Sequence, residues 1–196
     1  MLRGKKINIR TFINAKIIMQ KNNLQLLGNL IDLKILTQEI MSQNYLLWLK
    51  DNEVNKYLET KGDNINLKML TEYVTNMYMD PNNYLFGIFD KKGVHIGNIK
   101  LGNISQVHKR ADIGLLIGEK SYWGKGIASE AIGILTKFSF NILKLHKVYA
   151  GIYSNNIGSI HAFKKNKFYK SATFKEHAFY ENNFIDVYFY ETINND

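Results

Sequence analysis

The residues with the clearest chemical potential form a glycine-rich turn at positions 122–128, with the sequence YWGKGIA. This turn lies between a segment with strand alternation and a segment with helical spacing. The start of a helix presents backbone N–H groups that lack intrahelical acceptors, together with the positive end of the helix dipole. Glycine lets an anion approach those N–H groups, and Lys125 adds a positive charge. The turn is therefore interpreted as an anion site of the kind that holds a pyrophosphate.

Other phosphate-binding patterns fit this turn less well. A nucleoside-triphosphate loop has the pattern G-x-x-x-x-G-K-[ST], which the sequence lacks. A dinucleotide-binding fold has a third glycine where this chain has Ser129. Taken alone, a Gly-x-Gly ahead of a helix is equally compatible with an ordinary capped turn. The turn by itself therefore indicates an anion site and no particular ligand.

A second pattern, Asn156-x-x-Ser159 followed by Phe163 and Phe168, falls on a later segment with helical spacing. The two patterns together resemble the GNAT acetyltransferases, whose signature Q/R-x-x-G-x-G/A is similar to WGKGIA at residues 123–128. In that family, the helix that carries the second pattern flanks the pantetheine arm of acetyl-CoA. Two motifs at family spacing are more specific than either motif alone.

The resemblance extends over residues 29–192, with three departures from the family pattern, one of which, at Phe163, is taken up below with the chemistry. Trp123 stands where the signature has Gln or Arg, which affects one side-chain contact. Lys167 stands where the family usually has the glycine of a Gly-Phe pair. The string YWGKGIASEA is similar to the branch that contains ribosomal-protein N-terminal and polyamine acetyltransferases.

The resemblance implies that the chain binds acetyl-CoA as co-substrate, without a metal, and transfers its acetyl group to a primary amine by direct attack. Backbone N–H groups of the strand before the turn are implied to bind pantetheine and to meet the developing oxyanion. The residues implied to contact acetyl-CoA are Leu115, Leu116, Ile117, Trp123, Gly124, Lys125, Gly126, Ile127, Ala128, Ser129, Asn156, Ser159 and Phe163.

Attack by a primary amine requires a route for its proton, because an amine with a pKa of about 10.4 is almost wholly protonated at neutral pH. Glu119, at the end of the strand before the turn, and Asp112, within that strand, are the candidate catalytic bases. We favour Glu119. Either carboxylate is also open to a structural reading, as a solvated side chain or the partner of a lysine.

The family commonly uses a tyrosine on the last helix to protonate the departing thiolate, and Phe163 occupies the matching position here. Phenylalanine has no proton to give. Tyr149, Tyr153 and water are the alternative acids, although Tyr149 also suits strand packing. The departure supports a second hypothesis of another class, a CoA-binding module without catalytic activity.

Acceptor specificity in this family is expected from the loop between the first two helices, at residues 51–66, and from the last hairpin, at residues 174–184. The candidates for a cationic polyamine or a protein N-terminus are Glu53, Glu59 and Asp63. The candidates for a nucleotide-linked amino sugar are Tyr57, Asn64, Tyr180 and Asn182. The strings HIGNIKLG and ADIGLLIGE resemble acetyltransferases of surface-polysaccharide synthesis, which favours the amino sugar and leaves polyamines and ribosomal-protein N-termini as alternatives.

Hydrophobic periodicity predicts the strands and helices of one α/β (α+β) domain, and the resemblance to GNAT proteins implies that they form a single mixed, mostly antiparallel sheet of six to seven strands flanked by about four helices. Strands are expected at residues 29–37, 84–89, 94–101, 110–117 and 147–153, and as a final pair within 168–192 around a turn at 181–183. Helices are expected after Ser42 as N-cap and at residues 67–79, 129–143 and 157–165.

The composition describes an ordered globular protein, since 45% of the 196 residues are hydrophobic and one is proline. The absence of cysteine excludes thiolate chemistry and agrees with a cytoplasmic location. No apolar run approaches the roughly 20 residues of a membrane span. We expect residues 24–196 to form the acetyltransferase domain and the basic residues 1–23 to be a poorly ordered extension, with Met19 as an alternative start.

The net charge of +9 is compatible with nucleic acid, a membrane or a phosphate-rich small ligand. The lysines are interleaved with acidic residues, which favours the small ligand, so neither nucleic acid nor a membrane is expected as partner. The histidines show no metal-ligand spacing. The expected partner is a small-molecule amine, a homodimer is allowed, and nucleic-acid binding is kept as a third hypothesis.

Overall fold

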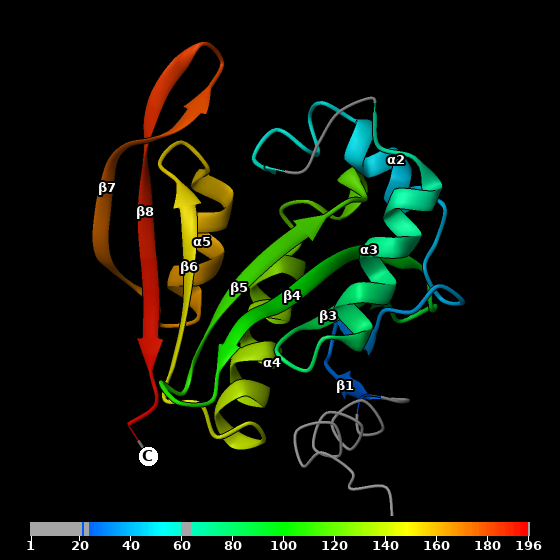
Figure 1. The fold of residues 1–196 in the computed structure, drawn as a ribbon, viewed down its shortest axis with the longest axis horizontal. Helices are drawn as coiled ribbons and strands as arrows, with labels where there is room; N and C mark the ends of the chain where they lie inside the picture. Colours follow the sequence, from blue (N-terminus) through cyan, green and yellow to red (C-terminus); the bar gives the residue numbers. More distant parts are fainter. Residues whose placement is uncertain (1–20, 22–23, 60–63, 196) are drawn as a thin grey trace, which may run out of the picture.

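The computed structural model describes residues 21, 24–59 and 64–195, which form one open eight-stranded sheet with helices on both faces (Figure 1). The strand order is β1-β2-β3-β4-β5-β6-β8-β7, and β5 and β6 are parallel while the other neighbours are antiparallel. The predicted mixed, mostly antiparallel sheet is confirmed, with eight strands in place of six to seven. Four α-helices have described bounds, in agreement with the prediction.

The first half of the chain supplies five strands and two helices. In chain order these are β1 (Gln25–Leu27), β2 (Ile31–Ile35), α2 (Asn44–Lys50), α3 (Leu67–Met79), β3 (Tyr84–Asp90), β4 (His95–Ser105) and β5 (Arg110–Ile117). The second half contains the 3-10 turn η1 (Lys120–Tyr122), α4 (Ile127–Asn141), β6 (Lys147–Tyr153), α5 (Ile157–Lys165), β7 (Tyr169–Tyr180) and β8 (Asn183–Ile193).

The sheet separates two apolar cores. On one face, α4 and α5 pack on the strands, and Leu135 of α4 is fully buried among Ile31, Phe86 and Val148 of the same cluster. On the other face, α2 and α3 form a second cluster in which Trp48 is buried. Burying one such side chain contributes about 1.5–3 kcal/mol, so truncating Leu135 to alanine would weaken the helix–sheet contact that fixes the start of α4.

The strands β5 and β6 pair over a short stretch and then diverge. Their register covers three residue pairs, from Arg110↔Lys147 to Asp112↔Tyr149. Beyond these, β5 continues along β4 to Ile117, whereas β6 pairs with β8 as far as Tyr153. The sheet is therefore open between the C-terminal ends of two neighbouring parallel strands, which is where open α/β sheets commonly bind ligands.

Three predicted boundaries are corrected by the structure. The first strand is shorter than 29–37 and is preceded by β1, a three-residue edge strand that the periodicity did not reveal. The prediction of Ser42 as N-cap was wrong: Gln43 occupies the cap, and the Ser42 N–H donates to His95 Nδ1 at 3.2 Å. The helix predicted from Ser129 begins two residues earlier, at Ile127.

Most of the predicted extension at residues 1–23 lies outside the described residues, as does Asp63. Lys21 is described, and its ammonium group donates to the backbone carbonyls of Asp80 and Asn83, both at 2.5 Å, beyond the end of α3. Within the described part of the chain, no helix is long and apolar enough to cross a bilayer.

Candidate active site

The glycine-rich turn opens α4 with its backbone N–H groups exposed. Gly126 is the N-cap of α4, with φ at 83°, and no side chain caps the helix. The Glu130 N–H bonds to the Gly126 carbonyl as the first bond within the helix, so the three N–H groups before it point into the turn. These N–H groups and the helix dipole can hold an anion.

The space beside the turn is open, and the conformation of the turn requires glycine. Gly124 has φ at 72° and Gly126 at 83°, a region that costs other residues about 1–2 kcal/mol. A Cβ added at Gly124 would meet no atom within 4 Å, and one at Gly126 would meet only Leu30 Cδ1 at 3.9 Å. A ligand group can therefore approach these amides directly, and the turn fits a pyrophosphate.

The strand β5 presents backbone groups to the opening on the other side of the turn. The Gly118 N–H donates to Ile96 O at 3.0 Å, so alternate residues such as Leu116 face β4. Leu115 and Ile117 then direct their N–H and C=O groups toward the opening. The Ile117 carbonyl accepts a hydrogen bond from Trp123 Nε1 at 2.9 Å, while its N–H stays available. The tryptophan that replaces Gln or Arg thus ties the turn to β5.

The second sequence pattern shapes the start of α5. Asn156 is the N-cap, and its side-chain oxygen accepts the Ser159 N–H at 3.2 Å. This bond explains the Asn-x-x-Ser spacing, because a cap accepts from the third helical residue. Phe163 is only 2% exposed, and its ring packs against that of Phe168 at 5.0 Å between centroids. Phe163, predicted as a cofactor contact, is therefore a core residue in this structure.

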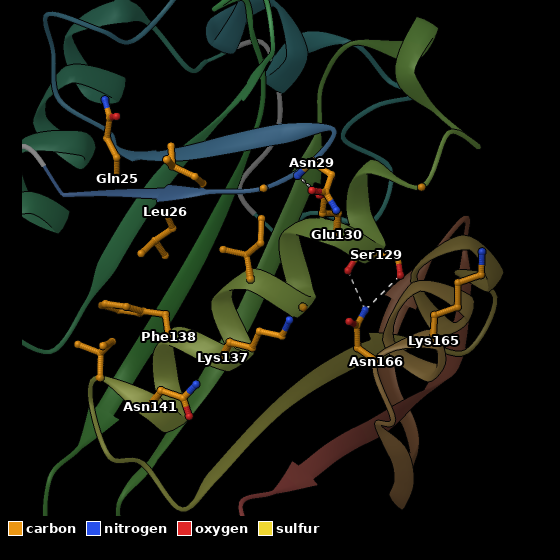
Figure 2. Close-up of a pocket in the computed structure, with 16 residues that line it drawn as sticks. Gln25, Leu26, Asn29, Ser129, Glu130, Lys137, Phe138, Asn141, Lys165 and Asn166 are labelled. Atoms are coloured by element: carbon orange, nitrogen blue, oxygen red, sulfur yellow. Dashed lines mark hydrogen bonds between the residues drawn. The ribbon is translucent and has the colours of Figure 1, made fainter.

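A groove of about 920 Å³ runs along α4 (Figure 2). At the end nearest the turn, Asn166 Nδ2 donates to the backbone O of Ser129 at 2.8 Å and to its Oγ at 3.2 Å. Glu130 accepts the Asn29 N–H from the β1–β2 turn at 2.5 Å. Most of the groove lies beside α4 and away from the opening between β5 and β6, so we do not assign the acyl chemistry to it.

The two candidate bases lie at opposite ends of β5. Asp112 is in the paired part of the strand, beside Tyr149, and accepts from Asn103 Nδ2 at 2.6 Å. Glu119 follows the open end of the strand, next to the turn. A strand rises about 3.3 Å per residue, which separates the two carboxylates by roughly 20 Å. Asp112 thus lies where the pairing of β5 with β6 ends, whereas Glu119 lies beyond the open part of β5 and beside the turn, and we keep Glu119 as the candidate.

A second cavity, of about 370 Å³, lies at the end of β6. Gly151 and Tyr153 line it, and they alternate with Ala150 and Ile152, which are buried in the core under α4 and α5. Because alternate residues of a strand face opposite ways, this cavity opens on the α2 and α3 face of the sheet. The residues that line it are Glu59, Gly151, Tyr153, His177, Ala178, Phe179, Val187 and Phe189.

Three tyrosine rings join the loop after α2 to the β6 and β7 side of the sheet. The Tyr57 ring stacks on that of Tyr180 at 5.5 Å between centroids, and the Tyr153 ring meets both edge-on, at 6.1 and 6.4 Å. Figure 1 shows this loop reaching from α2 toward the β6–β8 side. The sequence pointed to Tyr57 and Tyr180 separately, but no local signal indicated that they would meet, because their contact is set by the fold.

Ion pairs hold the start of the same loop close to Glu119. Lys120 Nζ lies 2.9 Å from an Asp51 oxygen and 2.6 Å from Glu53 Oε2. These are exposed ion pairs of modest strength, about 0–1 kcal/mol each. Glu53 is thus paired with a lysine, while Glu59 is the carboxylate that faces the cavity.

The comparisons with known proteins agree with this geometry. The sequence model of the family described as "Acetyltransferase (GNAT) domain" matches residues 38–169, more than half of the chain. The chain belongs to the GNAT acetyltransferase family. The match includes the glycine-rich turn, Glu119 and the capped start of α5, and this family binds acetyl-CoA.

Several curated GNAT proteins are similar in sequence. The "Probable N-acetyltransferase YjcK" of Bacillus subtilis is 35% identical over 105 residues, which is 53% of this chain and 57% of that protein. The "Spermidine N(1)-acetyltransferase" of Escherichia coli is 33% identical over 73 residues, which is 37% of this chain and 39% of that protein. The chain thus matches less than two thirds of the length of each of these two relatives.

Solved structures share the fold. The spermidine N-acetyltransferase from Vibrio cholerae in complex with CoA and spermine has a TM-score of 0.75 at 22% identity, over 85% of this chain and 96% of that chain. The ribosomal-protein-S5-alanine acetyltransferase from Vibrio fischeri has a TM-score of 0.77 at 16% identity, over 89% and 98%. At these identities the likeness establishes the GNAT fold and no particular acceptor.

Proposed function

We propose that this GNAT protein transfers the acetyl group of acetyl-CoA to the primary amine of a small, positively charged acceptor. The observation that carries the proposal is the opening between β5 and β6. An anion cradle borders it at residues 124–129, and a cavity with a carboxylate lies on the opposite sheet face. Cofactor and acceptor would therefore approach the same gap from different sides.

Acetyl-CoA supplies an activated thioester at this gap. In our proposal the N–H groups at the start of α4 hold its pyrophosphate, with Lys125 contributing a positive charge. The outward N–H groups of Leu115 and Ile117 hold the pantetheine arm and the carbonyl oxygen of the thioester. These contacts depend on the backbone, so they tolerate the change of the signature residue to Trp123.

Glu119 is proposed as the base that accepts the proton of the acceptor ammonium. The neutral amine nitrogen then forms an N–C bond to the acetyl carbon as the C–S bond breaks, and the nitrogen gives up its second proton while the CoA thiolate takes one up, which leaves a neutral amide and a thiol. Tyr153 is our candidate for relaying that proton, donating its own to the thiolate and regaining the one that the nitrogen releases. Burial, and next the charge of Glu59, raise the pKa of Tyr153, so its hydroxyl stays protonated at neutral pH.

The cavity favours a cationic acceptor over a nucleotide-linked amino sugar. Among the residues that line the cavity, Glu59 carries the acidic side chain. The aromatic rings of the lining, such as those of Tyr153 and Phe179, can hold an alkylammonium by cation–π contact. The diphosphate of a nucleotide sugar would be repelled by Glu59. The spermidine acetyltransferases among the relatives support a polyamine as the first acceptor to test.

Thiol release from acetyl-CoA, measured with spermidine, a nucleotide-linked amino sugar and an N-terminal alanine peptide, tests the proposal. We expect the highest kcat/KM with spermidine. Glu59→Gln should raise the KM for spermidine about tenfold, as expected for the loss of about 1.4 kcal/mol. Glu72→Gln, which removes an exposed carboxylate on α3, is the matched control and should leave KM unchanged.

Two outcomes would contradict the proposal. Turnover confined to the amino sugar would show that the acceptor was misassigned. Thermal stabilisation by CoA without thiol release from any amine would favour a CoA-binding module that lacks catalytic activity.

A further inference from the structure

The carboxylate of Glu119 is held by α2, an element distant from it in sequence. Its Oε1 accepts hydrogen bonds from Trp48 Nε1 at 3.1 Å and from Asn44 Nδ2 at 3.2 Å. In the described chain, no lysine or arginine pairs with this carboxylate, since the adjacent Lys120 binds the acids of the loop after α2. One oxygen of Glu119 is therefore fixed by two neutral donors, and among the described residues none donates to the other oxygen.

The Trp48 indole is itself fixed in place. Trp48 is 5% exposed and lies flat against Gly118, where an added Cβ would come within 1.9 Å of the Trp48 Cδ2 atom. Any other residue at position 118 would displace the ring. The glycine that precedes Glu119 thus lets the indole pack on the end of β5 and direct its N–H at the neighbouring carboxylate.

His95 packs against the same ring. The rings of His95 and Trp48 meet edge-on at 5.1 Å between centroids. His95 Nδ1 accepts the Ser42 N–H, so the proton of the neutral ring is assigned to Nε2, which lies 3.0 Å from Asn98 Oδ1. Burial lowers the pKa of His95, which keeps this ring neutral at neutral pH and adds no charge near Glu119.

We infer that Trp48 and Asn44 are positioning residues that orient Glu119 for proton transfer, acting through their hydrogen bonds to Oε1. The inference rests on the proposed role of Glu119 as base. Proton transfer depends steeply on geometry, and a misplacement of about 1 Å can cost about a hundredfold in rate. Two donors on one oxygen fix the carboxylate, and in our proposal the other oxygen accepts the proton of the acceptor amine.

The two tryptophans of the chain provide a matched pair of variants. Trp48→Phe keeps a ring on Gly118 and removes the N–H, so we expect kcat to fall about tenfold with the KM for acetyl-CoA unchanged. Trp123→Phe removes the N–H that binds the Ile117 carbonyl, so we expect it mainly to raise the KM for acetyl-CoA. Equal effects of both variants on kcat and KM would overturn the inference.

A double-mutant cycle with Glu119→Gln gives the decisive result. We expect Glu119→Gln to lower kcat about a hundredfold or more, and Trp48→Phe to change kcat less than about twofold in that background. An equal loss from Trp48→Phe in both backgrounds would show that Trp48 acts independently of Glu119. Wild-type turnover by Glu119→Gln would instead refute the proposed base, so the two failures are distinguishable.

Asn44→Ala covers the case in which Trp48→Phe fails to fold. Asn44 is exposed at the first position of α2, so alanine there leaves the core intact. We expect a loss of kcat of several-fold that disappears in the Glu119→Gln background. Retention of wild-type kcat by Asn44→Ala, with folding intact, would contradict the assignment of Asn44.

Discussion

The proposed cofactor side and the proposed acceptor side of this molecule consist of different kinds of groups. The cofactor side consists of backbone groups of consecutive residues, from the end of β5 through the glycine turn into α4. The acceptor side consists of side chains from distant segments, such as Tyr57, Tyr153 and Tyr180, which meet in space. A backbone site can be recognised from a short stretch of sequence, whereas a side-chain site depends on the whole fold.

The largest expected effect comes from filling the backbone site. Gly126→Glu places bulk and negative charge where the pyrophosphate is proposed to bind, and we expect CoA affinity to fall about a hundredfold or more, measured by titration calorimetry. Gly93→Glu is a matched control because Gly93, in the β3–β4 turn, has φ at 82° and open space around an added Cβ. Both variants should lose similar stability, and undiminished CoA binding by Gly126→Glu would show that the cradle was misplaced.

An intermediate effect is expected on the acceptor side. Tyr57→Ala removes the ring that stacks on Tyr180, so the KM for the acceptor should rise about tenfold while CoA affinity stays the same. Tyr57→Phe keeps the stacking and loses the hydroxyl with its hydrogen bonds, such as the one to Asn155 O at 3.2 Å, so its KM should change less than about threefold. The KM for the acceptor is measured by steady-state kinetics at saturating acetyl-CoA. A parallel loss of CoA affinity would break the distinction between the two sides.

The smallest expected effect is on stability. It tests whether the glycine that the family has after α5 is favoured there because of its backbone conformation. Lys167, at that position, has φ at 63°. Lys167→Gly should stabilise the protein by about 1 kcal/mol, because glycine adopts this conformation without steric cost. The same change at Lys164, inside α5, should destabilise it by a similar amount. Thermal unfolding measures whether each variant is more or less stable than the wild type. Lower stability of Lys167→Gly would contradict the explanation by backbone conformation.

Much of the fold could be predicted from the sequence because local pattern and tertiary packing agree. The bounds of α3, β5, β6 and α5 are those predicted from periodicity. β1 was missed because three residues at a sheet edge carry too little alternation. The cap at Ser42 was mispredicted because its hydroxyl, the group that would cap the helix, lies 3.1 Å from His95 Nδ1, a contact between segments far apart in the chain.

The candidate site divides in the same way. The glycine turn and Asn156 were found because each acts on the backbone of its own neighbours. The bond from Trp48 to Glu119 and the cavity beside Glu59 join residues whose proximity no local pattern encodes. Asp112 was grouped with Glu119 because both belong to one strand, and the length of that strand separates them.

Amide hydrogen exchange with and without CoA reports on the backbone groups that are proposed to hold the cofactor. We expect CoA to slow exchange at residues 124–129 and at Leu115 and Ile117, while the loop at residues 51–59 changes little until an acceptor amine is added. Protection at the loop with CoA alone, and none at the start of α4, would contradict the assignment of the two sides.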